Sequence, residues 1–185
     1  MKVLNVVFCV LYGLIGKVVC FHCDENAAHC FTSLDIKSAF TMIGKGNISQ
    51  VYVKDRAIYS INPAITDQVS IDDIITADGW NQTRHLITAN GSMPGPSIII
   101  YEKQKITILV TNHMINEAVT IHWHGIDQLG WPAMDGVAFV SQCPILSGQT
   151  FNYTFQPTFG GSYWYHSHVS NQRDMGMYGA FIVLR

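Results

Sequence analysis

Ala118-Val119-Thr120-Ile121-His122-Trp123-His124 is a run of β-branched and aromatic residues that ends in a His-x-His pair, and such a run predicts a β-strand. Ser162-Tyr163-Trp164-Tyr165-His166-Ser167-His168 has the same form. Because side chains alternate between the two faces of a strand, both imidazoles of a pair point to one side. Trp123 and Ser167 are expected on the opposite face.

The two pairs favour a metal site. Imidazole is the commonest metal ligand in proteins and suits copper, zinc and iron. A lone histidine is more often structural, and one His-x-His can arise by chance. Two pairs at strand spacing make metal binding the preferred interpretation.

The pattern around the two pairs, from Ala77 onward, is strand, turn, strand. Turn residues such as Asn90-Gly91, Asp135-Gly136 and Gly160-Gly161 separate the expected strands. Short strands at this spacing, with no helical stretch between them, predict an all-β sandwich of Greek-key type. The expected strands are Thr83–Ala89, Ser97–Tyr101, Lys105–Thr111, Ala118–His124, Val137–Ser141, Thr150–Phe155, Ser162–His168 and Gly179–Leu184.

The overall composition excludes some classes of protein. The 185 residues are enough for one domain and an extension, and a hydrophobic fraction of 48% is not membrane-like. A formal net charge of -2, with no basic run, argues against a nucleic-acid partner.

The N-terminus has the form of a secretory signal peptide. Lys2 precedes the apolar stretch 3–16, which is too short to span a bilayer comfortably, so we expect residues 1–20 to be removed on export. A buried helix or a membrane anchor is the alternative. Export would make N-glycosylation possible at four acceptor sequences. These are Asn47-Ile48-Ser49, Asn81-Gln82-Thr83, Asn90-Gly91-Ser92 and Asn152-Tyr153-Thr154.

Residues 21–73 form a cysteine-bearing N-terminal extension to the expected domain at 74–185. In an exported protein Cys20, Cys23 and Cys30 are expected to form disulfides. A zinc site that also uses His22 and His29 is the alternative, but its spacing fits no standard module. Cys143 stands alone far downstream.

Five motifs, taken in order, resemble the first cupredoxin (plastocyanin-like) domain of a multicopper oxidase, most closely of the animal laccase type. The resemblance covers roughly residues 74 to 185, and Asn90-Gly91-Ser92-Met93-Pro94-Gly95-Pro96 resembles a further turn of that family. The motifs are Ile121-His122-Trp123-His124-Gly125, Met134-Asp135-Gly136, Gln142-Cys143-Pro144-Ile145, Tyr165-His166-Ser167-His168 and Asn171-Gln172-Arg173.

The resemblance implies half of a trinuclear copper cluster. His122 would bind the type 2 copper, His124 and His166 would share one type 3 copper, and His168 would bind the other. Asp135 would stand near the type 2 copper and help to move protons to oxygen. From the residues alone, the turn residue of an Asp-Gly pair is the favoured interpretation of Asp135.

The chain also departs from the family pattern. It has no His-Cys-His segment for a type 1 copper, and no histidine follows Cys143 closely enough to replace one. We therefore expect either a fragment of a longer oxidase or a short product without the other cupredoxin domains. Cys143 would pair with a cysteine of a missing domain.

Other conspicuous residues are expected to be structural. His85 and His113 are isolated and have the pattern of surface residues. Met175 and Met177 are expected to pack rather than to bind copper. The aromatic residues of the strands are expected to pack the sandwich and to wall the histidines. They are Trp123, Trp131, Tyr163, Trp164 and Tyr165.

Three functions fit the sequence. The first is the copper-binding first domain of a secreted, laccase-like enzyme that oxidises phenol-type reductants with O2. The second is a non-catalytic secreted protein that binds copper or a partner. The third is a zinc hydrolytic site, since His-x-His with a third histidine also builds zinc centres. The second His-x-His pair and the order of the motifs disfavour this last function.

Overall fold

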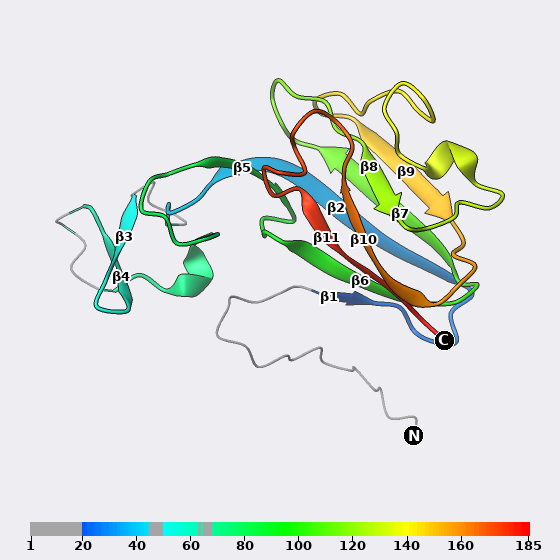
Figure 1. Cartoon of the computed structure of the whole chain (residues 1–185), viewed down its shortest axis with the longest axis horizontal. Coiled ribbons are helices and arrows are strands. Elements are labelled where there is room, and N and C mark those ends of the chain that lie inside the picture. The colour runs from blue at the N-terminus through cyan, green and yellow to red at the C-terminus, as the bar shows by residue number, and fades with distance from the viewer. Residues whose placement is uncertain (1–19, 45–49, 63, 65–67) are drawn as a thin grey trace.

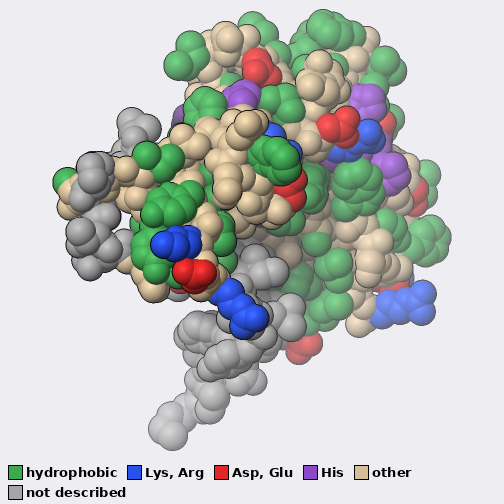
Figure 2. Space-filling model, turned by 60° about the vertical axis from the view of Figure 1, so that its left-hand side comes forward, with side chains coloured by type: hydrophobic (Ala, Val, Ile, Leu, Met, Phe, Trp, Pro, Cys, Tyr) green, Lys and Arg blue, Asp and Glu red, His purple; other side chains and the backbone are tan. Residues whose placement is uncertain are grey.

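The computed structural model describes residues 20–44, 50–62, 64 and 68–185 as two packed β-sheets with a small hairpin to one side (Figure 1). The expected signal peptide and the Asn47 sequon, drawn in grey in Figure 2, lie outside the described residues. No helix within these ranges is long and apolar enough to cross a membrane. The all-β sandwich predicted from the strand and turn pattern is confirmed.

Eleven strands and two short 3-10 helices make up the described part of the chain. The five-stranded sheet has the order β1 (Cys20–His22), β6 (Gly95–Tyr101), β11 (Tyr178–Leu184), β10 (Gly161–Ser167), β8 (Ile121–His124). The four-stranded sheet has the order β5 (His85–Ala89), β2 (His29–Phe40), β7 (Lys105–Asn112), β9 (Thr150–Phe155). The hairpin consists of β3 (Val51–Lys54) and β4 (Ala57–Ser60), and the helices are η1 (Ile71–Asp73) and η2 (Pro132–Met134).

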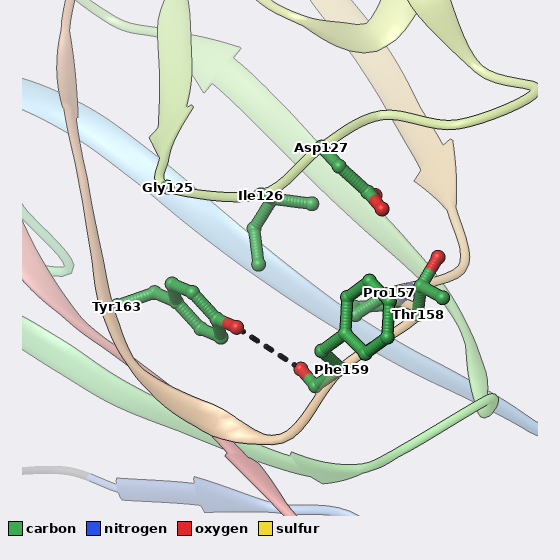
Figure 3. A pocket seen from close by; sticks show the side chains of 7 residues that line it. All are labelled: Gly125, Ile126, Asp127, Pro157, Thr158, Phe159 and Tyr163. Atoms are coloured by element: carbon green, nitrogen blue, oxygen red, sulfur yellow. Dashed lines mark hydrogen bonds between the residues drawn. The ribbon is translucent and has the colours of Figure 1, made fainter.

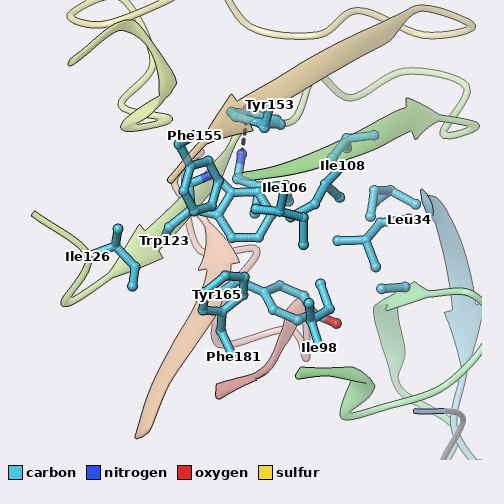
Figure 4. Close-up of a cluster of buried hydrophobic side chains, with 14 of the residues drawn as sticks. Leu34, Ile98, Ile106, Ile108, Trp123, Ile126, Tyr153, Phe155, Tyr165 and Phe181 are labelled. Carbon is cyan, nitrogen blue, oxygen red and sulfur yellow. Dashed lines mark hydrogen bonds between the residues drawn. The ribbon is translucent and has the colours of Figure 1, made fainter. Parts of the chain in front are cut away.

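Trp123 lies at the centre of the core, between the two sheets (Figure 4). Its ring centroid is 5.4 Å from that of Tyr153 and 5.1 Å from that of Phe155, both on β9 of the four-stranded sheet. It is 5.9 Å from Tyr165 and 5.7 Å from Phe181, which belong to its own sheet. All five rings are fully buried, so the inward face of β8 and β10 joins the two layers.

The sandwich begins earlier in the chain than the expected division at residue 74. β1 pairs in parallel with β6, and the long strand β2 pairs in parallel with β7 and antiparallel with β5. Leu34 and Ile36 of β2 are fully buried in the core. The alternation along β2 is hard to see in the sequence because Phe31 faces solvent and Thr32 occupies an inward position.

Cys23 and Cys30 form a disulfide across the connection between β1 and β2, as expected for the N-terminal cysteine cluster. Both cysteines are buried. The disulfide uses two of the five residues of the alternative zinc site, and a third, His29, shares a hydrogen bond of 2.9 Å with the Thr107 hydroxyl. The zinc alternative at the N-terminus is therefore not supported.

The expected strand Val137–Ser141 is wrong. These residues form a tight turn, in which Val140 N–H and Ser141 N–H both donate to Val137 O, and Phe139 has a φ of 62°. The Ser141 hydroxyl bonds both backbone polar atoms of Val137 and closes the turn. Because Phe139 and Val140 point into solvent, the apolar character of this segment does not come from core packing.

Candidate metal centre

The ladder between β8 and β10 places three histidines and one tryptophan on a single face. In the antiparallel register His122 lies opposite His166, and His124 lies opposite Trp164. Residues directly opposite each other share a face, and so do residues two apart along a strand. Trp123 and Tyr165 consequently point the other way, into the core.

The three imidazoles converge closely enough to hold a metal ion. One ring nitrogen from each of His122, His124 and His166 lies within 4.8 Å of the other two. The His124 Nδ1 to His166 Nε2 distance is 3.4 Å. Two nitrogens each about 2.0–2.1 Å from one tetrahedral ion would lie about 3.4 Å apart, so this separation fits a shared ion.

Hydrogen bonds orient two of these rings for ligation. Nδ1 of His122 lies 2.7 Å from the backbone oxygen of Asp135, and Nδ1 of His166 lies 2.8 Å from Ser167 O. A carbonyl can only accept, so each Nδ1 carries the proton and each Nε2 keeps a lone pair. Metal-binding histidines are commonly held by this arrangement.

The surroundings of His166 favour the neutral ring that a metal requires. Burial lowers the pKa of His166, and the nearby charges of His122, His124 and Arg173 lower it further. The hydrogen bond to Ser167 O acts in the opposite direction. Since a ligating imidazole must be unprotonated, the lowered pKa supports ligation near neutral pH.

His168 lies beside this group rather than within it. β10 ends at Ser167, so His168 follows the strand, and its side chain is exposed. Its ring centroid is 5.5 Å from that of His122 and 6.1 Å from that of His166. Its backbone N–H donates to Thr120 O at 3.1 Å. Among the described residues, the group within ligand distance contains the other three histidines and not His168.

Asp135 contacts His122 through both its backbone and its side chain. Besides the carbonyl contact, one carboxylate oxygen lies 3.4 Å from His122 Nδ1. Gly136 makes this approach possible, because a Cβ at that position would lie 1.8 Å from Ile121 O, and its φ is +79°. Asp135 and Gly136 thus form a turn, which was the interpretation from the residues alone, and Asp135 also contacts a candidate ligand.

Trp164 walls the histidines, as expected from its place in the strand. Its ring centroid lies 4.3 Å from that of His166 and 4.9 Å from that of His124. The indole therefore covers one side of the pair whose nitrogens are 3.4 Å apart.

Sequence reasoning did not identify a buried polar group behind the site. Gln172, which is 1% exposed, contacts Ser167, Glu117 and the backbone of Ala118. The only signal was the position of Gln172 in the Asn-Gln-Arg motif four residues after the second pair. That motif does not indicate which atoms would form hydrogen bonds with the Gln172 amide.

The remaining candidates lie outside the histidine group. His113 pairs with the Asp35 carboxylate at 3.2 Å, and the ring of His85 lies against Phe40. Met177 is fully buried, and Met175 packs against the core. Cys143 is exposed. All of these residues lie outside the histidine group of the described structure.

A small pocket adjoins the end of β8 but holds no comparable set of ligands (Figure 3). The Tyr163 hydroxyl crosses it to donate to Phe159 O at 3.2 Å. Its one carboxylate belongs to Asp127. The lining residues are Gly125, Ile126, Asp127, Pro157, Thr158, Phe159 and Tyr163.

Comparisons with known proteins agree on one family. A sequence model described as "Multicopper oxidase" matches residues 73–185. The chain is 47% identical over 109 residues to Laccase-2 of Botryotinia fuckeliana, which covers 59% of the chain and 18% of that protein. It is 43% identical over 112 residues to the iron transport multicopper oxidase FET3 of Saccharomyces cerevisiae, and this match covers 60% of the chain and 18% of that protein.

A solved structure gives the same result. The laccase from Botrytis aclada superposes with a TM-score of 0.64 and 32% sequence identity, over 88% of this chain and 24% of that one. The chain spans less than a fifth of the length of the two curated relatives. All three proteins are fungal, so the animal subtype stays an expectation.

Proposed function

The chain belongs to the multicopper oxidase family, and from that premise we propose that it is the copper-binding first cupredoxin domain of a laccase-like oxidase. In this proposal His122 binds the type 2 copper, and His124 and His166 share one type 3 copper. His168 binds the other type 3 copper. The convergence of three imidazole nitrogens within 4.8 Å, on the outward face of β8 and β10, carries the proposal.

The donor set fits copper. Imidazole nitrogen is a favoured ligand for copper, which stands at the top of the affinity order for divalent metals. When bound, the adjacent copper ions would pass four electrons from the reductant to O2, which is thereby reduced to water. The protein's own part is to hold the Nε2 lone pairs of His122 and His166 in place through their Nδ1–H bonds. Asp135, 3.4 Å from His122, would hold a proton beside the ligands.

Phenol-type reductants and O2 are the proposed substrates of the whole enzyme. The relatives include a laccase and an iron transport oxidase, so the family resemblance leaves the choice of reductant open. These 185 residues contain no His-Cys-His segment. We therefore assign electron entry, and the other four cluster ligands, to further cupredoxin domains.

We also propose that the protein is secreted. The disulfide between Cys23 and Cys30 fits an oxidising compartment. Residues 1–20 would act as a signal peptide, and glycans would be attached at exposed sequons such as those of Asn81 and Asn152. A non-catalytic copper or interaction protein is not favoured, because the relatives are oxidases.

Metal analysis and oxygen uptake test the proposal together. The full chain, purified and loaded with Cu(II), is expected to retain copper with the electron paramagnetic resonance signal of nitrogen ligands. It is expected to show no sustained O2 consumption with a phenol. Selective retention of zinc over copper would contradict the copper assignment. Sustained four-electron reduction of O2 would contradict the need for ligands from other domains.

A further inference from the structure

Gln172 is a buried glutamine whose side-chain amide connects the ends of the two histidine segments. Its Nε2 donates to Glu117 Oε2 and to Ala118 O, both at 2.9 Å. Its Oε1 accepts from the Ser167 hydroxyl at 2.6 Å. Both amide hydrogens and the carbonyl oxygen therefore have partners in a side chain that is 1% exposed.

The partners of Gln172 belong to the two segments that carry the candidate ligands. Ser167 separates His166 from His168, and its hydroxyl also accepts from Val169 N–H at 3.3 Å. Glu117 and Ala118 begin the segment that leads into β8 and His122. The amide of Gln172 thus ties the loop after β10 to the segment before β8.

His168 depends on this connection more than the other histidines do. His122 and His166 are paired across the β8–β10 ladder, which fixes their spacing without help from the loop. His168 lies beyond the end of β10, and its backbone bond to Thr120 O joins the two segments that Gln172 bridges. Without the bridge, the loop that carries His168 would lose the buried amide that ties it to the segment before β8.

We propose that Gln172 is a positioning residue for His168, which it holds beside His122 and His166 through Ser167 and Glu117. The expected effect on copper binding rests on the proposed function. The placement of His168 by Gln172 does not depend on it. Gln172 makes no hydrogen bond to the imidazoles, and its role is to hold the loop residue His168 beside His122 and His166.

Hydrogen exchange of the metal-free full chain tests the placement directly. Gln172→Leu is expected to speed exchange of the His168 amide by about tenfold or more, because local opening of the loop becomes easier. The Glu102 amide, bonded to Leu184 O far from the site, serves as the reference and is expected to be unchanged. Equal exchange of the His168 amide in both proteins would overturn the proposal.

Gln104→Leu is the matched control. Gln104 is also a buried glutamine, and its Nε2 donates to the carbonyls of Asp24, Glu25 and Ala27, away from the histidines. It is expected to lower thermal stability without changing exchange at His168. Acceleration at His168 by both variants alike would show a general loss of stability and would contradict a specific role.

Copper affinity provides the second measurement. Gln172→Leu is expected to weaken Cu(II) binding by about 10- to 100-fold, as is typical for loss of an outer-shell partner, and Gln104→Leu to leave it within about twofold. An unchanged copper affinity in Gln172→Leu would overturn the role in ligation. If the wild-type chain bound no copper, the proposed function would fail, while exchange would still decide the role of Gln172.

Gln172→Glu keeps the shape of the side chain and tests the bridge through its charge. The carboxylate can still accept from Ser167 but repels Glu117 and Ala118 O, so the same two effects are expected. Adding Glu117→Gln supplies a new donor to the carboxylate at position 172 and should recover part of the lost affinity. Failure of the double variant to recover any affinity would contradict the proposed bridge.

Discussion

The two faces of the β8–β10 strand pair have opposite tasks. Inward, Trp123 and Tyr165 are fully buried and pack between the sheets. Outward, His122 and His166 bring their ring nitrogens together beside Trp164 at the edge of the five-stranded sheet. Because successive side chains of a strand point to opposite faces, neighbouring residues serve different purposes: one stabilises the core and the next can bind a metal. The two properties should therefore respond differently to substitution.

The largest difference is expected between two tryptophans on opposite faces. Trp123→Ala removes the ring that contacts Tyr153 and Phe155 and should lower the free energy of unfolding by about 3–5 kcal/mol. Trp164→Ala, at a half-buried position beside His124, should cost less than half as much. It should instead weaken copper binding by the folded chain. Urea unfolding and copper titration measure the two effects.

Equal losses of stability for the two tryptophan variants would break the comparison. So would an unchanged copper affinity in Trp164→Ala, because the indole would then have no part in holding the rings of His124 and His166.

A smaller effect is expected at the turn that brings Asp135 to His122. Gly136→Ala places a Cβ against Ile121 O in a left-handed backbone conformation, and should cost about 2–4 kcal/mol. Gly130→Ala is the matched control, since its φ is +81° but nothing lies within 4 Å of the added Cβ. It should cost about 1 kcal/mol. Urea unfolding of both variants checks the difference, and equal costs would show that the close approach to β8 is unimportant.

The smallest effect concerns the hydroxyl that supports β8 from the core. Tyr153 Oη accepts from Ile121 N–H at 2.9 Å, so Tyr153→Phe should cost about 1–2 kcal/mol at neutral pH. Burial raises the pKa of Tyr153 far above its ordinary value. Its contribution is therefore complete below about pH 10 and is lost as the pH rises further, when only the unfolded chain ionises.

The free energy of unfolding, measured from pH 8 to 11, separates the contribution of the hydrogen bond from that of Tyr153 ionisation. Wild type should lose stability above about pH 10, and Tyr153→Phe should lose less over the same interval. Tyr165, whose pKa burial also raises, remains to give a residual slope. Identical slopes in the two proteins would contradict the burial of the Tyr153 hydroxyl.

The sequence predicted the local features of the site well. The period of two along a strand was enough to place His122 and His124 on one face and Trp123 in the core. Turn residues such as Asn90-Gly91 separated most strands correctly, because positive φ values are needed there and few residues allow them. Residue type and spacing indicated a metal site, whereas copper and the role of each histidine were predicted from the family resemblance.

Features that depend on non-local contacts were missed. β2 pairs with β7 about 75 residues later in the chain, and nothing in its own residues identifies that neighbour. Val137–Ser141 has strand-like residues but forms a turn, because the Ser141 hydroxyl closes it and no strand of the described residues pairs with it. The bridge from Gln172 to Glu117 spans 55 positions and could be found only from the fold.

Copper affinity of single histidine variants of the full chain tests the central claim most directly. His122→Ala and His124→Ala should each weaken Cu(II) binding by more than the about 10- to 100-fold expected for an outer-shell residue, with little loss of stability. His85→Ala and His113→Ala should bind copper like the wild type, because both rings lie outside the group of three. Unchanged affinity in the first two variants, or equal losses in all four, would contradict a copper site on the outward face of β8 and β10.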